Sequence, residues 1–103
     1  MVRGGPGRQG SRWRRVQAQC LADAALYAAP CFLCGLRIDY SLYYLHRWAA
    51  TVHHIVGLAD GGDPLDPANL APAHRSCNCR DGAHRRQHPE LYRRPAAANS
   101  RRW

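Results

Sequence analysis

The chain has 103 residues and a formal net charge of +8, a length that accommodates one small domain and excludes a second. It contains no run of about eighteen apolar residues, which excludes a membrane-spanning helix. Its Gly- and Arg-rich start lacks the apolar core of a secretion signal, and we therefore expect a cytoplasmic protein.

The charge comes entirely from arginine, with fifteen arginines, no lysine and seven acidic residues. Such an excess predicts a polyanionic partner, and nucleic acid is the first candidate. An alternative is that the arginines only keep the surface soluble, but most of them cluster toward the two ends, as in phosphate-contacting arms. These arginines are Arg3, Arg8, Arg12, Arg14, Arg15, Arg85, Arg86, Arg93, Arg94, Arg101 and Arg102.

The first element expected is a helix that follows a flexible basic tail over residues 1–11. Apolar residues then recur in steps of three and four, which predicts an amphipathic helix from residue 12 to about 29, ended by Pro30. Its apolar positions are Trp13, Val16, Cys20, Ala24 and Tyr27. Ser11 is placed to cap this helix, and Cys20 is expected to be a buried core residue, with metal ligation as the alternative.

Two pairs of metal-ligand residues follow. Cys31 and Cys34 form a Cys-x-x-Cys knuckle, and His74 and Cys77 have the same spacing, which together predict a structural zinc site with three thiolates and one imidazole. Five cysteines, an odd number, fit metal ligation better than a disulfide framework. Cys79 competes with Cys77, but the two lie about 200° apart around a helix, so one ion is not expected to bind both.

The pairs are separated by 39 residues, 35 to 73, far more than in a compact zinc ribbon. The aromatic stretch at 36–48 has no decisive period, whereas the β-branched segment that follows predicts a strand, a Gly- and Pro-rich loop and a short returning strand. A helix and a basic tail complete the chain. The expected ranges are strand 50–58, loop 59–68, strand 69–74, helix 74–87 and tail 89–103.

The ordered motifs "CFLCG", "VHHIVGLADGG", "DPANL" and "HRSCN", over about residues 31–82, resemble the HNH endonucleases. These are the ββα-metal or His-Me finger nucleases, and the likeness is greatest to small members encoded by bacteriophages. The resemblance implies an α+β fold: a small zinc-stabilised ββα-metal domain, here residues 12–88, with an N-terminal helix and basic tails.

Position by position, the resemblance implies that His54 is the general base and that Asn69 holds the loop backbone around it. His53 stands where most members have Asp and would bind the catalytic metal, with Asn78 as the second protein ligand. Successive strand residues point to opposite faces, so His53 and His54 share a site only where the strand twists or ends.

The implied activity is metal-dependent hydrolysis of DNA, with double-stranded DNA favoured. The catalytic ion could be Mn²⁺, Ni²⁺, Mg²⁺ or Zn²⁺, and His53 in place of Asp should shift preference away from Mg²⁺. The phage members suggest work beside a terminase in genome packaging, in the host cytoplasm, or a homing or host-DNA role. The alternative is a non-catalytic, zinc-stabilised nucleic-acid-binding module, and oligomeric state and sequence specificity stay open.

Overall fold

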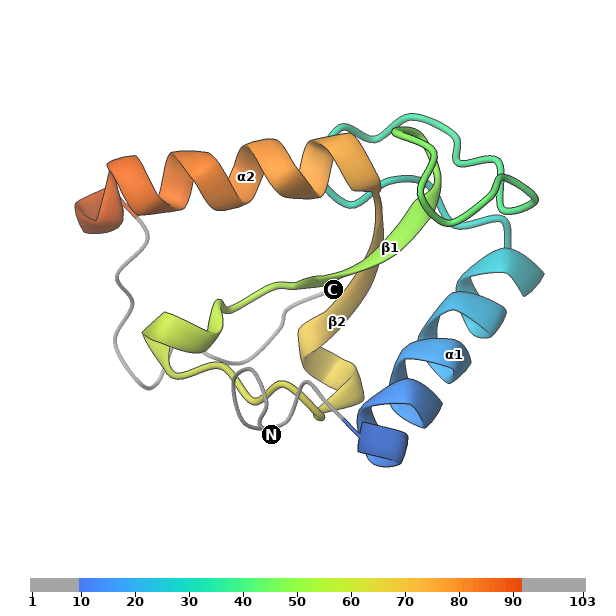
Figure 1. The fold of residues 1–103 in the computed structure, drawn as a ribbon, viewed down its shortest axis with the longest axis horizontal. Helices are drawn as coiled ribbons and strands as arrows, with labels where there is room; N and C mark the ends of the chain where they lie inside the picture. The colour runs from blue at the N-terminus through green and yellow to red at the C-terminus, as the bar shows by residue number, and fades with distance from the viewer. Residues whose placement is uncertain (1–9, 92–103) are drawn as a thin grey trace.

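The computed structural model describes residues 10–91, which form a two-stranded hairpin followed by a helix, with a further helix in front. Figure 1 shows the hairpin between the two helices, α1 on one side and α2 on the other. The order of elements confirms the predicted α+β, ββα architecture with an N-terminal helix. The helices and strands are α1 (Gly10–Leu26), β1 (Ala50–His54), β2 (Leu70–His74) and α2 (Arg75–Gln87).

Helix α1 begins and ends slightly earlier than the sequence predicted. It starts at Gly10, so Ser11 lies inside the helix instead of capping it. It ends at Leu26, and Ala28 then adopts a left-handed φ of 51°. The prediction that Cys20 is buried is wrong, because the side chain is only half-buried; Ala24 is the buried residue of α1. Of the two predicted tails, residues 1–9 and 92–103 lie outside the described part of the chain.

The strands pair antiparallel, with Ala50 opposite His74 and His54 opposite Leu70. Strand β1 ends at His54, earlier than the predicted residue 58. Beyond His54 the backbone N–H of Ile55 still donates to the Asn69 carbonyl, at 2.9 Å. The loop then turns at two short 3-10 helices, Leu58–Asp60 and Pro67–Asn69.

The Gly-Gly pair in this loop is required by the backbone. Gly61 has a φ of 89°, a conformation that residues with a Cβ rarely adopt. Gly62 lies so close to the Val56 carbonyl that a Cβ at this position would collide with it. The same Cβ would lie 2.9 Å from the side-chain amide nitrogen of Asn69, which is also too close. The loop is therefore closed tightly over Asn69.

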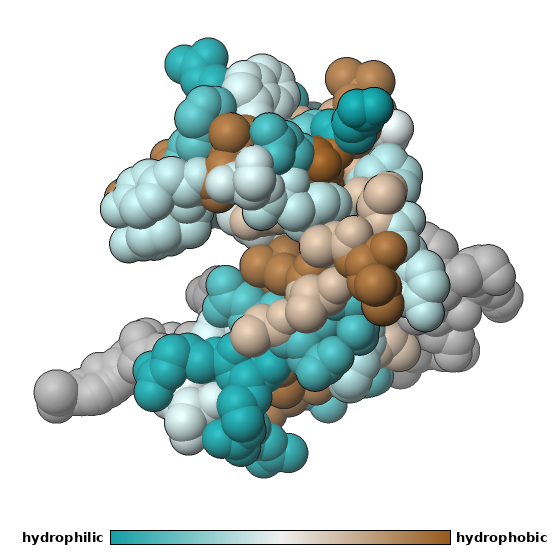
Figure 2. All heavy atoms as spheres, turned by 90° about the vertical axis from the view of Figure 1, so that its right-hand side faces the viewer, coloured by the Kyte–Doolittle hydropathy of each residue, from teal (hydrophilic) through white to brown (hydrophobic). Residues whose placement is uncertain are grey.

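The residues between α1 and β1 carry the knuckle and supply part of the core. Cys31 and Ile38 from this segment pack with Ala73 of β2 and Cys77 of α2, so half of this cluster consists of thiols. A core this small provides little hydrophobic stabilisation, which leaves a role in folding for a bound metal. In Figure 2, apolar groups adjoin one another in a band across the middle of the side shown, with hydrophilic groups above and below it. Within residues 10–91, none of the helices has the length and apolar character needed to cross a membrane.

Candidate active site and metal centre

The four predicted zinc ligands form one compact cluster. Their ligand atoms, from Cys31, Cys34, His74 and Cys77, all lie within 4.8 Å of one another. The Nδ1 atom of His74 is 3.4 Å from the Cys34 sulfur and 3.7 Å from the Cys77 sulfur. Tetrahedral zinc, with Zn–S near 2.3 Å and Zn–N near 2.0 Å, places N and S about 3.6 Å apart. The arrangement is therefore consistent with a Cys3His zinc site.

Neighbouring groups orient these ligands. The Nε2 atom of His74 lies 3.0 Å from the Arg37 carbonyl, so its N–H donates there and the Nδ1 lone pair faces the thiols. The backbone N–H groups of Cys34 and His74 each donate to the Cys31 sulfur, at 3.4 Å. Burial on its own raises the pKa of Cys31, but the hydrogen bonds outweigh it and lower that pKa to about 6.

Electrostatics in the cluster call for a cation. Burial, followed by the hydrogen bond with Cys34 and the charge of Cys31, raises the pKa of Cys77 to about 11. A second thiolate is thus opposed by the first, and a divalent cation among the sulfurs reverses that repulsion.

The choice between Cys77 and Cys79 follows from the helix. Cys77 is buried in the cluster, whereas Cys79 is exposed and contributes no atom to it. Cys20 also lies outside the cluster, which removes its alternative role as a ligand to this ion.

A second pair of possible metal ligands, His53 of β1 and Asn78 of α2, lies next to this cluster, because Asn78 directly follows Cys77. The Nδ1 atom of buried His53 is 3.0 Å from Oδ1 of Asn78. The Asn78 amide N–H₂ donates to the Val52 carbonyl at 3.2 Å and to the Thr51 hydroxyl at 3.3 Å, which turns its oxygen toward His53. The Phe32 ring stacks on His53 with centroids 5.6 Å apart.

These two donors suit a divalent metal. Burial lowers the pKa of His53, so the imidazole stays neutral, and its Nδ1–H donates to Oδ1 of Asn78, which can only accept. Neighbouring ligands of an octahedral ion with bonds near 2.1 Å are about 3.0 Å apart, and His53 Nδ1 and Asn78 Oδ1 have that separation of 3.0 Å. To hold an ion together with Asn78, His53 would take its other neutral tautomer, in which the proton is on Nε2 and the lone pair is on Nδ1.

His54 contacts different elements from its neighbour. Its Nε2 atom lies 3.3 Å from the Pro64 carbonyl in the loop, and its ring stacks on Trp13 of α1, with centroids 5.4 Å apart and planes inclined by 23°. His53 instead contacts Asn78 and Phe32. The two imidazoles therefore face opposite sides of β1, as strand geometry predicts. His54 is the last residue of the strand, and the loop begins directly after it.

Asn69 joins the two ends of the loop. Its Oδ1 accepts a hydrogen bond from the Val56 backbone N–H at 2.7 Å, and its N–H₂ donates to the carbonyls of Val56 and Asp63, both at 3.1 Å. These bonds fix the backbone on both sides of the turn that follows His54.

The arginines considered as donors to the developing negative charge differ in their contacts. Arg85 is committed to Asp81 at 2.7 Å and to Asp60 at 3.6 Å, which ties α2 to the loop. Arg80 donates to the Cys77 sulfur at 3.5 Å, and Arg75 to the Leu45 carbonyl at 3.4 Å. Arg86 is exposed on the last turn of α2.

Sequence reasoning missed two aromatic residues at this site. Trp13 was predicted only as part of the apolar face of α1, and no role was predicted for Phe32. Local spacing shows that Trp13 faces inward, but only the packing of α1 on β1 shows that its partner is His54.

A ββα unit with a Cys3His cluster at the hairpin–helix junction, and a His–Asn pair beside it, defines a small ββα-metal domain. The HNH endonuclease family matches residues 31–84, just over half of the chain, and the chain belongs to that family. Family members are generally phosphodiester hydrolases, so membership suggests nuclease activity and implies a nucleic-acid substrate. Searches of curated proteins and of solved structures gave no significant match.

Proposed function

We propose that this protein is a metal-dependent endonuclease that hydrolyses phosphodiester bonds in double-stranded DNA. The observation that carries the proposal is the pair of donor atoms from His53 and Asn78, 3.0 Å apart, in a chain of the HNH family. His53 is adjacent to His54 in β1, and Asn78 is adjacent to the zinc ligand Cys77 in α2. The two imidazoles face opposite sides of β1, and the proposal is that DNA reaches both the base and the metal-binding pair at the end of this strand, where His54 is the last residue.

His54 is the proposed general base. When Nε2 carries the ring proton it donates to the Pro64 carbonyl, 3.3 Å away, and Nδ1 keeps its lone pair. That nitrogen takes a proton from the attacking water. Asn69 supports the base by fixing the loop backbone that contains Pro64.

His53 and Asn78 are the proposed protein ligands of the catalytic ion. When bound, a divalent metal would act as a Lewis acid on the scissile phosphate. Because His53 supplies a neutral nitrogen where most family members have a carboxylate, the pair should prefer Mn²⁺, Ni²⁺, Co²⁺ or Zn²⁺ over Mg²⁺.

The Cys3His cluster is proposed to hold structural zinc. It joins the segment before β1 to the start of α2 and closes the 39 residues, 35 to 73, between its two halves. Cys77 and Asn78 lie about 100° apart around α2, so one faces the cluster and the other faces His53. Zinc would therefore hold α2 in the orientation that brings Asn78 to the catalytic pair.

The basic character of the chain supports a DNA substrate, since a net charge of +8 favours phosphate contacts of any sequence. Resemblance to small phage members suggests that the enzyme would assist a terminase in genome packaging.

Nicking of supercoiled plasmid by the zinc-loaded protein tests the proposal. Wild type should cut with added Mn²⁺ or Ni²⁺, His54→Ala should not, and the matched control His46→Ala, a change at an exposed histidine, should cut like wild type. DNA binding without cleavage by any of these proteins, with every metal, would instead indicate the non-catalytic binding module.

A further inference from the structure

Helix α1 lies outside the region matched by the HNH family, residues 31–84, yet it contacts the proposed base. The contact is the stack of Trp13 on the His54 ring, with centroids 5.4 Å apart and an interplanar angle of 23°. We propose that Trp13 is a positioning residue for His54, which makes α1 a working part of the active site. This inference rests on the proposed function.

The orientation of the His54 ring needs support from outside its strand. His54 is the last residue of β1, and the chain then enters a loop, so the strand fixes where its Cβ points but not its ring plane. The Pro64 carbonyl fixes one ring nitrogen, at 3.3 Å, and Trp13 fixes the ring face. These two contacts hold the ring from its edge and from its face, and both bear on the direction in which Nδ1 points.

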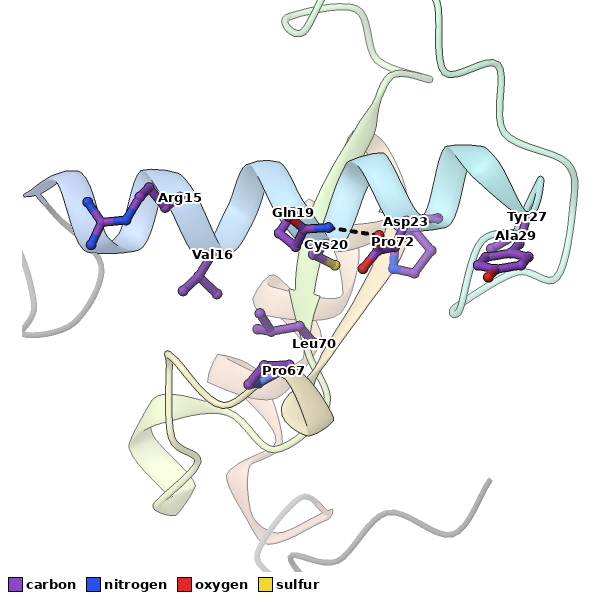
Figure 3. Close-up of a pocket in the computed structure, with 11 residues that line it drawn as sticks. Arg15, Val16, Gln19, Cys20, Asp23, Tyr27, Ala29, Pro67, Leu70 and Pro72 are labelled. Carbon is purple, nitrogen blue, oxygen red and sulfur yellow. Dashed lines mark hydrogen bonds between the residues drawn. The ribbon is translucent and has the colours of Figure 1, made fainter.

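Trp13 belongs to α1, and a pocket separates part of this helix from the hairpin. An open pocket of about 560 Å³ lies between α1 and a surface formed by Pro67 and by Leu70 and Pro72 of β2. Figure 3 shows Val16 and Cys20 on the side of α1 that faces Leu70 and Pro67 across this space. Trp13 lies one turn before Val16, and its stack on His54 is one of the contacts that join α1 to the end of β1.

The proposal predicts a defect in the chemical step rather than in DNA binding. Trp13→Leu removes the flat ring and should lower kcat by about ten- to a hundredfold through misplacement of the base, with KM changed by less than about twofold. Trp13→Phe keeps a stacking ring and should retain kcat within about threefold of wild type. Tyr27→Leu is the matched control, because it removes an exposed aromatic ring just after α1 and should leave kcat unchanged.

The experiment combines single-turnover cleavage with NMR spectra of the zinc-loaded variants. The His54 ring protons, assigned with His54→Ala, should move in Trp13→Leu because they lose the indole ring current, and should stay in place in Tyr27→Leu. The inference is overturned if those resonances do not move, which shows that the rings are not stacked. It is also overturned if they move while kcat stays within about twofold of wild type, or if Trp13→Phe loses as much activity as Trp13→Leu.

Two further outcomes separate this inference from the proposed function. Equal loss of kcat in Trp13→Leu and Tyr27→Leu would show general loosening of α1 and overturn the positioning role alone. Absence of cleavage by wild type with Mn²⁺, Ni²⁺ and Mg²⁺ would remove the proposed function and this inference with it, even when the NMR spectra show the stack.

Discussion

Replacement of Asn69 by alanine should destabilise the domain strongly, because this side chain holds the loop after β1. Asn69 is 8% exposed and makes three hydrogen bonds to the backbone of Val56 and Asp63, at 2.7, 3.1 and 3.1 Å. Val56 is buried, so its N–H and carbonyl would be left without these partners, at about 1–3 kcal/mol each. Water can reach the Asp63 carbonyl more easily, and its loss should cost little.

The expected loss of unfolding free energy in Asn69→Ala is therefore about 2–6 kcal/mol, a large share of the roughly 5–15 kcal/mol typical of a folded domain. Urea unfolding of the zinc-loaded protein, followed by circular dichroism, measures this quantity. Gln87→Ala is the control, because it truncates an exposed amide at the end of α2 and should stay within about 0.5 kcal/mol of wild type. An equally small effect in Asn69→Ala would refute the role of these hydrogen bonds.

The remaining predictions concern zinc, the loop and pH. Cys77→Ser should lose the bound zinc and much of the folded structure, whereas Cys79→Ser should keep both, as measured by metal content and circular dichroism; equal zinc content would contradict the cluster. Gly62→Ala should destabilise by more than about 1 kcal/mol in urea unfolding because its Cβ meets the Val56 carbonyl. Gly82→Ala, inside α2, where a Cβ would meet only the end of the Arg86 side chain at an ordinary 3.5 Å, should stabilise by about 0.5–1 kcal/mol. Burial lowers the pKa of His53, so the unfolded chain binds this proton more tightly and stability should fall as the pH drops below about 6.5. His53→Gln should lose less stability over that range, and identical pH profiles would count against the burial effect.

Motif spacing was sufficient to predict the metal cluster. Cys31 with Cys34, and His74 with Cys77, each present two ligands from one turn of backbone, so local geometry restricts the choice. The helical period also distinguished Cys77 from Cys79, since residues two apart on α2 face different directions. The structure brings the four expected ligands together within 4.8 Å.

Burial on α1 could not be predicted in the same way, because it depends on the size of the neighbouring sheet. A helix of 17 residues is about 25 Å long, whereas two strands about 4.8 Å apart cover only a narrow strip of it. Cys20 therefore has the spacing of a core residue but remains half-buried beside a pocket. The periodicity placed Val16, Cys20 and Ala24 on the side of α1 that faces the hairpin, but the prediction for Tyr27 is wrong, because this residue lies beyond the helix and is 79% exposed.

The end of β1 and the contacts of His54 depend on residues distant in sequence. Ile55 and Val56 favour a strand locally, but the side chain of Asn69 takes the place of a strand partner for Val56, and the chain turns. The stack of Trp13 on His54 joins residues 41 positions apart, 13 to 54, and follows from how α1 packs on the hairpin. Neither contact has a local signal in the sequence.

The most direct test of the central claim is the single-turnover rate of DNA cleavage by wild type and His54→Ala, with zinc content measured on the same samples. We predict one zinc per chain in both proteins, equal DNA affinity, and cleavage only by wild type and only after a second metal such as Mn²⁺ is added. Cleavage by His54→Ala at the wild-type rate, or cleavage by wild type that needs no added metal, would contradict the account.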